Sequence, residues 1–157
     1  MRIFGFGFQL HNVSSRTLYQ IEGFEHRTLL WGVKSIDKYL EKLLKDQPQY
    51  ILGLGIYTGK GKDYLHLETE TVNQFKKSKI DDVIQEKLNI NPFLKESEKL
   101  KFTNTIGTSF CNYVSWKIVS EIQKGKLKSE YSFVHIPKSF EASMSGTVIQ
   151  DQLDNLS

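Results

Sequence analysis

The chain has 157 residues, enough for one domain with a hydrophobic core and too few for two. Hydrophobic residues make up 39% and charged residues 25% of the sequence, which excludes disordered and fibrous classes of protein. The net charge is only +3 and lysines are interspersed with acidic residues, so we expect a solvated surface and no nucleic-acid partner. We expect residues 1–157 to form a single domain.

Features of secreted and membrane proteins are missing from the sequence. Residues 1–13 have one basic residue and an apolar stretch broken by glycines, with no cleavage site behind it, so we expect no signal peptide. No apolar run approaches the roughly 18 residues of a membrane span, so we expect no membrane partner. The single cysteine, Cys111, cannot form an internal disulfide, which favours a reducing, cytoplasmic location.

Strand and helix patterns alternate along the chain. Apolar or alternating runs predict strands at 2–8, 27–33, 49–56, 64–73, 101–107 and 130–137. Periodic polar and apolar residues predict helices at 15–24 (short or irregular), 35–47, 78–88, 108–125 and 142–153. This order predicts an α/β fold, a three-layer αβα sandwich around a central, mostly parallel, mixed sheet.

The expected elements carry local signals of their boundaries. Ser35 is the expected N-cap of the clearest helix, and the uninterrupted apolar run at 49–56 is typical of a central strand covered on both faces. Residues 89–100 read as a polar connection. Because chemistry in such sheets gathers where strands end, the loops after Gly55, Val72, Ile106 and Ile136 are the candidate site.

Two common motifs fail on spacing. Gly55 and Gly59 enclose three residues where a phosphate-binding loop has four, and Lys60 is followed by glycine where serine or threonine belongs. The dinucleotide fingerprint fails because Thr58 stands in place of its third glycine. The four histidines show no paired-ligand spacing, so we expect neither a metal nor another cofactor.

Cys111 follows a turn at Gly107 and falls in the first turn of the expected helix, with Thr108 as its N-cap. Unpaired N–H groups and the helix dipole favour a thiolate there and can hold an oxyanion. The alternative is that the cysteine is core filler, since cysteines pack well as small hydrophobic residues. Taken alone, Cys111 is better explained as a residue packed in the core than as a nucleophile.

Two further positions suit a thiol-based site. His135 ends a strand 24 residues after Cys111, and a single right-handed crossover between them would make their strand ends neighbours or near-neighbours. Glu68 and Glu70 alternate along 64–73 and so share a face, from which one carboxylate can orient the imidazole. The alternatives are a strand-end histidine bonded to backbone and two glutamates on an exposed edge strand.

Together these segments resemble the pyroglutamyl-peptidase I family, the pyrrolidone-carboxylate peptidases, which are cytoplasmic cysteine peptidases. "GTSFCNYV" resembles the family's nucleophile segment and "FVHIP" its histidine strand, while "ETETVN" resembles its Glu-Arg-x-Ala-x-Asn strand. The resemblance implies that Cys111, His135 and Glu68 are catalytic. It also implies that Phe8, Asn12, Lys62 and Asn73 bind substrate.

The chain departs from this family in its middle. It is shorter than typical members, mainly between Asn73 and Gly107, and has no arginine after Arg27. The family's two-phenylalanine clamp keeps at most Phe8, with Leu10 or His11 near the second position. The resemblance implies removal of N-terminal pyroglutamate from a blocked peptide, and it leaves a homo-oligomer open. The alternatives are hydrolysis of another amide or acyl substrate, and an inactive relative acting as a binding protein.

Overall fold

The computed structural model describes residues 1–9 and 12–156. Six strands form one sheet in the order β2-β1-β3-β8-β4-β7. Their bounds are β1 (Ile3–Phe8), β2 (Phe24–Leu30), β3 (Tyr50–Tyr57), β4 (Leu65–Glu68), β7 (Leu100–Thr103) and β8 (Glu130–Pro137). A separate two-stranded sheet pairs β5 (Glu70–Val72) with β6 (Lys87–Asn89). Leu10 and His11, considered above for the second aromatic position, lie outside the described residues.

The strands run mostly parallel, as the sequence predicts. β1 pairs in parallel with β2 and β3, and β3 pairs in parallel with β8. β4 is antiparallel to β8 and parallel to β7. The expected crossover from the strand before Cys111 to the strand of His135 is therefore wrong, because β7 and β8 run in opposite directions with β4 between them. Glu68 lies on that intervening strand.

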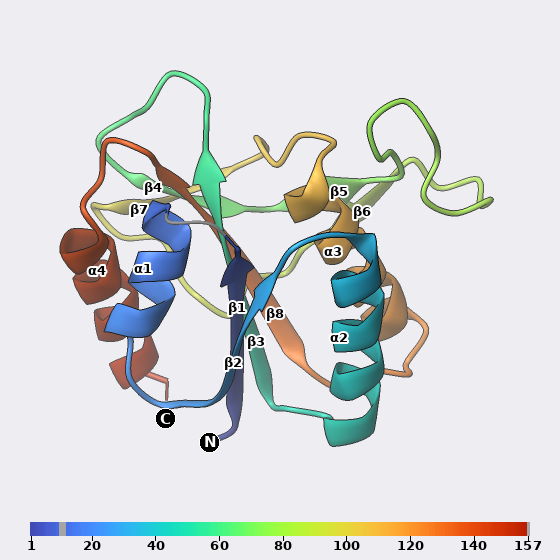
Figure 1. The fold of residues 1–157 in the computed structure, drawn as a ribbon, viewed down its shortest axis with the longest axis horizontal. Helices are drawn as coiled ribbons and strands as arrows, with labels where there is room; N and C mark the ends of the chain where they lie inside the picture. The colour runs from blue at the N-terminus through green and yellow to red at the C-terminus, as the bar shows by residue number, and fades with distance from the viewer. Residues whose placement is uncertain (10–11, 157) are drawn as a thin grey trace.

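In the part of the chain that the structure describes, four helices cover the sheet in two layers (Figure 1). They are α1 (Val13–Gln20), α2 (Val33–Asp46), α3 (Phe110–Gln123) and α4 (Ala142–Asp154). α1 and α4 lie on one face, where the buried Thr17 and Ser145 hydroxyls are 2.6 Å apart, and α2 and α3 lie on the other. The three-layer αβα sandwich is confirmed, and β3 is its buried central strand.

The starts of α1 and α2 both differ from the sequence expectation, and a side chain caps each helix. α1 begins after Asn12, whose Oδ1 accepts hydrogen bonds from the N–H groups of Ser14 and Ser15. α2 begins at Val33, so Ser35 is not its N-cap. The Ser35 hydroxyl instead accepts bonds from the backbone N–H groups of Trp31 and Gly32, which caps the helix from its third residue.

Residues 64–73 do not form one strand. The chain leaves the main sheet at Thr69, whose N–H and hydroxyl both donate to the carbonyl of Thr103. Residues 70–72 then pair with β6 in the second sheet. Glu68 and Glu70 therefore belong to different sheets, and the expectation that they share a face of one strand is wrong.

The helix expected at 78–88 is also wrong, because that segment consists of turns and bends that run into β6. Asn73 accepts bonds from the N–H groups of Ile80 and Asp81 and donates to the carbonyls of Asp81 and Gln85. These bonds hold the backbone of residues 80–85 in a loop that folds back on Asn73. Ile84 is 90% exposed in this loop, whereas Ile80 and Leu88 pack against the core.

The connection at 89–100 is less polar than expected. Ile90, Phe93 and Leu94 are buried in it, and the hydroxyl of Ser132 on β8 accepts bonds from the N–H groups of Phe93 and Leu94. Within residues 1–9 and 12–156, no helix has the length and apolar character needed to cross a membrane.

Candidate active site

Cys111 lies at the start of α3, behind a turn that its sequence sets. Gly107 has φ +78°, a left-handed conformation that glycine adopts without strain. The helix begins at Phe110, so the residue in the cap position is Ser109 and not Thr108, as the sequence suggested. The Tyr113 N–H donates to the Ser109 carbonyl and closes the first turn. Cys111, the second helical residue, keeps some exposed surface, although its thiol is closely surrounded by protein.

The Cys111 thiol lies directly over the central strand. A Cβ placed on Gly55 would be 2.6 Å from Cys111 Sγ and 3.2 Å from His135 Cδ2. Only a glycine at this position on β3 leaves room for the sulfur. Cys111 Sγ and His135 Cδ2 therefore both lie close to the same point over Gly55, and Cδ2 is bonded to Nε2.

His135 is paired with Glu68 and not with Glu70. Its Nδ1 lies 3.0 Å from Glu68 Oε1, and both side chains are buried. The register explains the contact: His135 faces His66 across the antiparallel β4–β8 pair, so Glu68, two residues further along β4, is its diagonal neighbour. Glu70 Oε1 instead lies 4.0 Å from the Lys87 amine.

Glu68 is held as a carboxylate in a buried position. Thr105 donates twice to it, from its N–H to Oε2 at 2.8 Å and from its hydroxyl to Oε1 at 2.6 Å. Burial alone would raise the pKa of this carboxyl. The hydrogen bonds from His135 and Thr105 outweigh burial, so the pKa of Glu68 is lowered. A charged Glu68 in turn favours the tautomer of His135 that carries its proton on Nδ1, leaving Nε2 free.

The sequence predicts a depressed thiol pKa at Cys111, and the structure contradicts this. Desolvation by burial, followed by the charge of Glu68, raises the pKa of Cys111 to about 12, although its own backbone N–H opposes the shift. The helix start therefore does not outweigh burial. At neutral pH the resting group is a thiol, and a base must remove its proton before the sulfur can attack a carbonyl.

Cys111 and His135 line one cavity of about 530 Å³. Phe8 and Asn12, two of the expected substrate-binding residues, line it too, so the structure brings them to the thiol. Lys62, which is exposed, is not among its lining residues. Among the residues that the structure describes, no group of three or more His, Cys, Asp or Glu side chains is placed to hold a metal ion.

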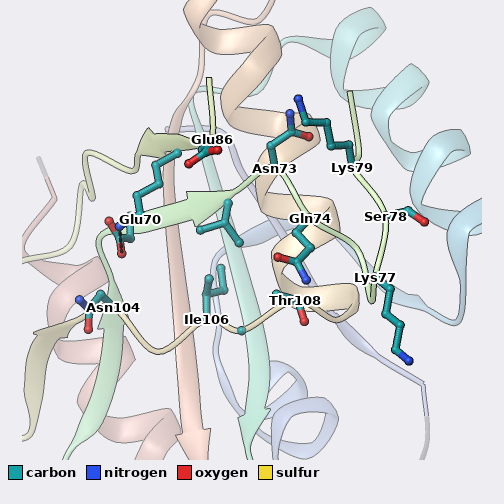
Figure 2. A pocket seen from close by; sticks show the side chains of 13 residues that line it. Glu70, Asn73, Gln74, Lys77, Ser78, Lys79, Glu86, Asn104, Ile106 and Thr108 are labelled. Atoms are coloured by element: carbon teal, nitrogen blue, oxygen red, sulfur yellow. Dashed lines mark ion pairs between the residues drawn. The ribbon is translucent and has the colours of Figure 1, made fainter. Parts of the chain in front are cut away.

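Asn73 lines a second cavity, of about 680 Å³, between β5 and the loop before α3 (Figure 2). Ile106, Gly107 and Thr108 line both cavities, so this loop separates them. The Asn73 carboxamide is hydrogen-bonded to the backbone of residues 80–85, so its polar atoms already have partners. It lines a different cavity from the thiol.

Sequence reasoning missed Asn112, the residue after the cysteine. Its buried carboxamide accepts from the Val72 N–H and the Thr71 hydroxyl and donates to the carbonyls of Val72 and Gln74. These hydrogen bonds fix the helix that carries Cys111 to the end of β5. A polar residue on the buried side of an otherwise apolar helix was the signal that could have identified it.

The chain is similar to known peptidases in sequence and in fold. No family model matches the chain. The curated pyrrolidone-carboxylate peptidase of Oceanobacillus iheyensis is 26% identical over 133 residues, which cover 71% of this chain and 65% of that relative. The chain thus spans less than two thirds of the length of the curated relative that it matches.

Solved structures give the stronger likeness. The pyrrolidone carboxyl peptidase of Thermus thermophilus matches with a TM-score of 0.78 at 14% identity, covering 99% of this chain and 100% of that one. This chain has the pyrrolidone carboxyl peptidase fold. The pyroglutamyl peptidase I of Bacillus amyloliquefaciens matches at 0.77 and 16% identity, covering 97% of this chain and 93% of that one. The resemblance to the pyroglutamyl-peptidase I family is therefore confirmed.

Proposed function

We propose that this chain is a cysteine peptidase that removes N-terminal pyroglutamate from peptides, with Cys111, His135 and Glu68 as its catalytic residues. The observation that carries the proposal is the buried pair of His135 Nδ1 and Glu68 Oε1 at 3.0 Å, with Cys111 Sγ and His135 Cδ2 both close to the same point over Gly55. The pyrrolidone carboxyl peptidase fold supports this assignment. The single reduced cysteine suits a cytoplasmic enzyme, and the reaction needs no cofactor.

The mechanism starts from a neutral thiol, because the pKa of Cys111 is raised. As the sulfur attacks the substrate carbonyl carbon, its proton passes to Nε2 of His135, and charged Glu68 stabilises the imidazolium. The N–H groups of the first turn of α3 have no carbonyl partner within the helix, so they can hold the oxyanion.

The intermediate then collapses in two stages. His135 gives its proton to the leaving amine, the C–N bond breaks and a thioester to Cys111 remains. His135 next takes a proton from a water molecule, which attacks the thioester. The departing sulfur recovers a proton from His135, which releases pyroglutamate and restores the thiol.

The Cys111 cavity suits a small, neutral, N-terminal ring. Phe8 and Ile56 give it apolar walls, and the side chain of Asn12 faces the same space while capping α1. We propose Phe8 and Asn12 as substrate-binding residues. We propose that Lys62 and Asn73 bind only parts of the substrate beyond the ring, since neither residue lines the cavity. We also propose assembly of this chain into a homo-oligomer.

The test is release of a fluorophore from a pyroglutamyl conjugate by the purified protein. We expect Cys111→Ala and His135→Ala to abolish release, while Glu70→Gln, a matched change on the neighbouring strand, leaves it unchanged. Acylation by an activated ester without hydrolysis of the pyroglutamyl conjugate would favour another acyl substrate. An inert thiol in both assays would favour a binding protein.

A further inference from the structure

A chain of hydrogen bonds extends beyond the three proposed catalytic residues. His66 Nδ1 lies 3.0 Å from Thr105 Oγ1, which lies 2.6 Å from Glu68 Oε1. Glu68 Oε1 is also the atom that contacts His135 Nδ1. His66 and Glu68 are on β4, whereas Thr105 is on the loop that leads to Cys111. The chain therefore joins the acid's strand to the nucleophile's loop.

The directions of these bonds follow from proton counting. Charged Glu68 only accepts hydrogen bonds, and the single hydroxyl proton of Thr105 is donated to it. The Thr105 oxygen must then accept from His66, so the proton of the neutral His66 ring is on Nδ1. Nε2 of His66 is consequently an unprotonated nitrogen, and it is buried without a hydrogen-bond partner.

His66 is poorly explained by packing alone. Its side chain is buried in the sheet between Leu65 and Leu67, with the Tyr57 ring centroid 4.2 Å away. An unsatisfied buried nitrogen destabilises a fold, so an apolar side chain would fill this place at lower cost. What histidine adds is one N–H aimed at the Thr105 hydroxyl, and such a donor strengthens the bond that the hydroxyl makes in turn.

We propose that Thr105 and His66 are positioning residues that act through Glu68. The test of this proposal by enzyme activity rests on the proposed function. Thr105 fixes both carboxylate oxygens, and His66 orients the Thr105 hydroxyl. Glu68 can then meet His135 in one orientation only. This keeps the Nδ1 proton of His135 in place and its Nε2 directed to the thiol of Cys111.

Matched variants distinguish the effect of losing the Thr105 hydroxyl or the His66 N–H from the effect of changing side-chain volume. Thr105→Val removes the hydroxyl at nearly constant volume, and Thr105→Ser keeps it. His66→Leu removes the donor, whereas His66→Asn keeps an N–H close to the position of Nδ1. We expect the valine and leucine variants to lose about 10- to 100-fold in kcat with KM changed less than about twofold. The serine and asparagine variants should retain most of the activity.

A second readout does not depend on peptidase activity. The proton of His135 Nδ1, held against a carboxylate, should give a downfield NMR resonance, assigned by its loss in His135→Ala. We expect that resonance to shift or broaden in Thr105→Val and to persist in Thr105→Ser, with melting temperatures showing that both variants are folded. An unchanged resonance in folded Thr105→Val, or equal effects of valine and serine, would overturn the proposal. A normal resonance pattern in a protein without peptidase activity would instead count against the proposed function alone.

Discussion

Replacing Glu68 with glutamine should have opposite effects on the reactivity of Cys111 toward an alkylating reagent and on turnover. The charge of Glu68 is one of the causes that raise the pKa of Cys111, second to burial. Removing that charge lowers the thiol pKa and increases the thiolate available to iodoacetamide. The same change leaves the imidazolium of His135 without its carboxylate, so hydrolysis should fall.

The magnitude follows from the pKa of about 12 at Cys111. Compared with a free thiol of pKa about 8.5, the thiolate fraction at pH 7 is lower by about 3000-fold. A thiolate of higher pKa is more nucleophilic, which recovers about 40-fold. We therefore expect Cys111 to be alkylated about 100-fold more slowly than a free thiol, and Glu68→Gln to speed this by up to about tenfold.

The assay is simple because the chain contains one cysteine. Intact mass after timed exposure to iodoacetamide reports Cys111 alone. The rate should rise about tenfold per pH unit from pH 7 to 10 without a plateau, because the thiol titrates above this range. Glu70→Gln is the matched control and should behave as wild type, since Glu70 contacts Lys87 and not His135.

Two outcomes would refute this reasoning. A wild-type plateau below pH 8.5 would mean that the thiolate is stabilised by His135 or by the helix start more strongly than burial opposes it. A Glu68→Gln protein alkylated no faster than wild type would show that the charge of Glu68 does not reach the sulfur.

Gly55→Ala should reduce kcat at least about tenfold because its Cβ would lie 2.6 Å from Cys111 Sγ. Gly53→Ala, which crowds Phe6 and Phe133 and not the sulfur, should lower the melting temperature without changing alkylation. Asn112→Ala should lower the free energy of unfolding by about 3 kcal/mol, measured by urea titration, since it unpairs buried backbone groups. Asn73→Leu should make the 74–86 segment sensitive to limited proteolysis, and cleavage rates matching wild type would contradict the role of its amide.

The fold could be predicted because its central strands are encoded locally. The apolar runs of β3 and β8 are long enough to identify strands buried on both faces, and both are observed where expected. The antiparallel direction of β4 could not be predicted, since no short turn or repeat in the sequence sets it. That direction is what makes Glu68 a diagonal neighbour of His135, so the pairing with Glu68 over Glu70 needed the structure.

The errors share one physical origin, which is that tertiary contacts overrode local preference. The 78–88 segment has helical periodicity, but four hydrogen bonds between its backbone and the amide of Asn73 hold it in a loop. The thiol pKa follows burial and a carboxylate that is 43 positions distant in sequence, and not the helix start alone. Thr105 gave no sequence signal, because a threonine in a polar loop is ordinary.

Segment 74–86 and the proposed catalytic side chains are held by different contacts. Segment 74–86 is tied to β5 through Asn73 and to α3 through the bond from Trp116 Nε1 to Asp81 at 2.6 Å. The pair of His135 and Glu68 depends instead on the register of β4 and β8, and the thiol's position depends on Gly55. A change of length between Asn73 and Gly107 can therefore reshape the second cavity while the geometry around Cys111 persists. Divergence in that segment therefore bears on the second cavity, and it leaves the geometry around Cys111 to the strands beneath it.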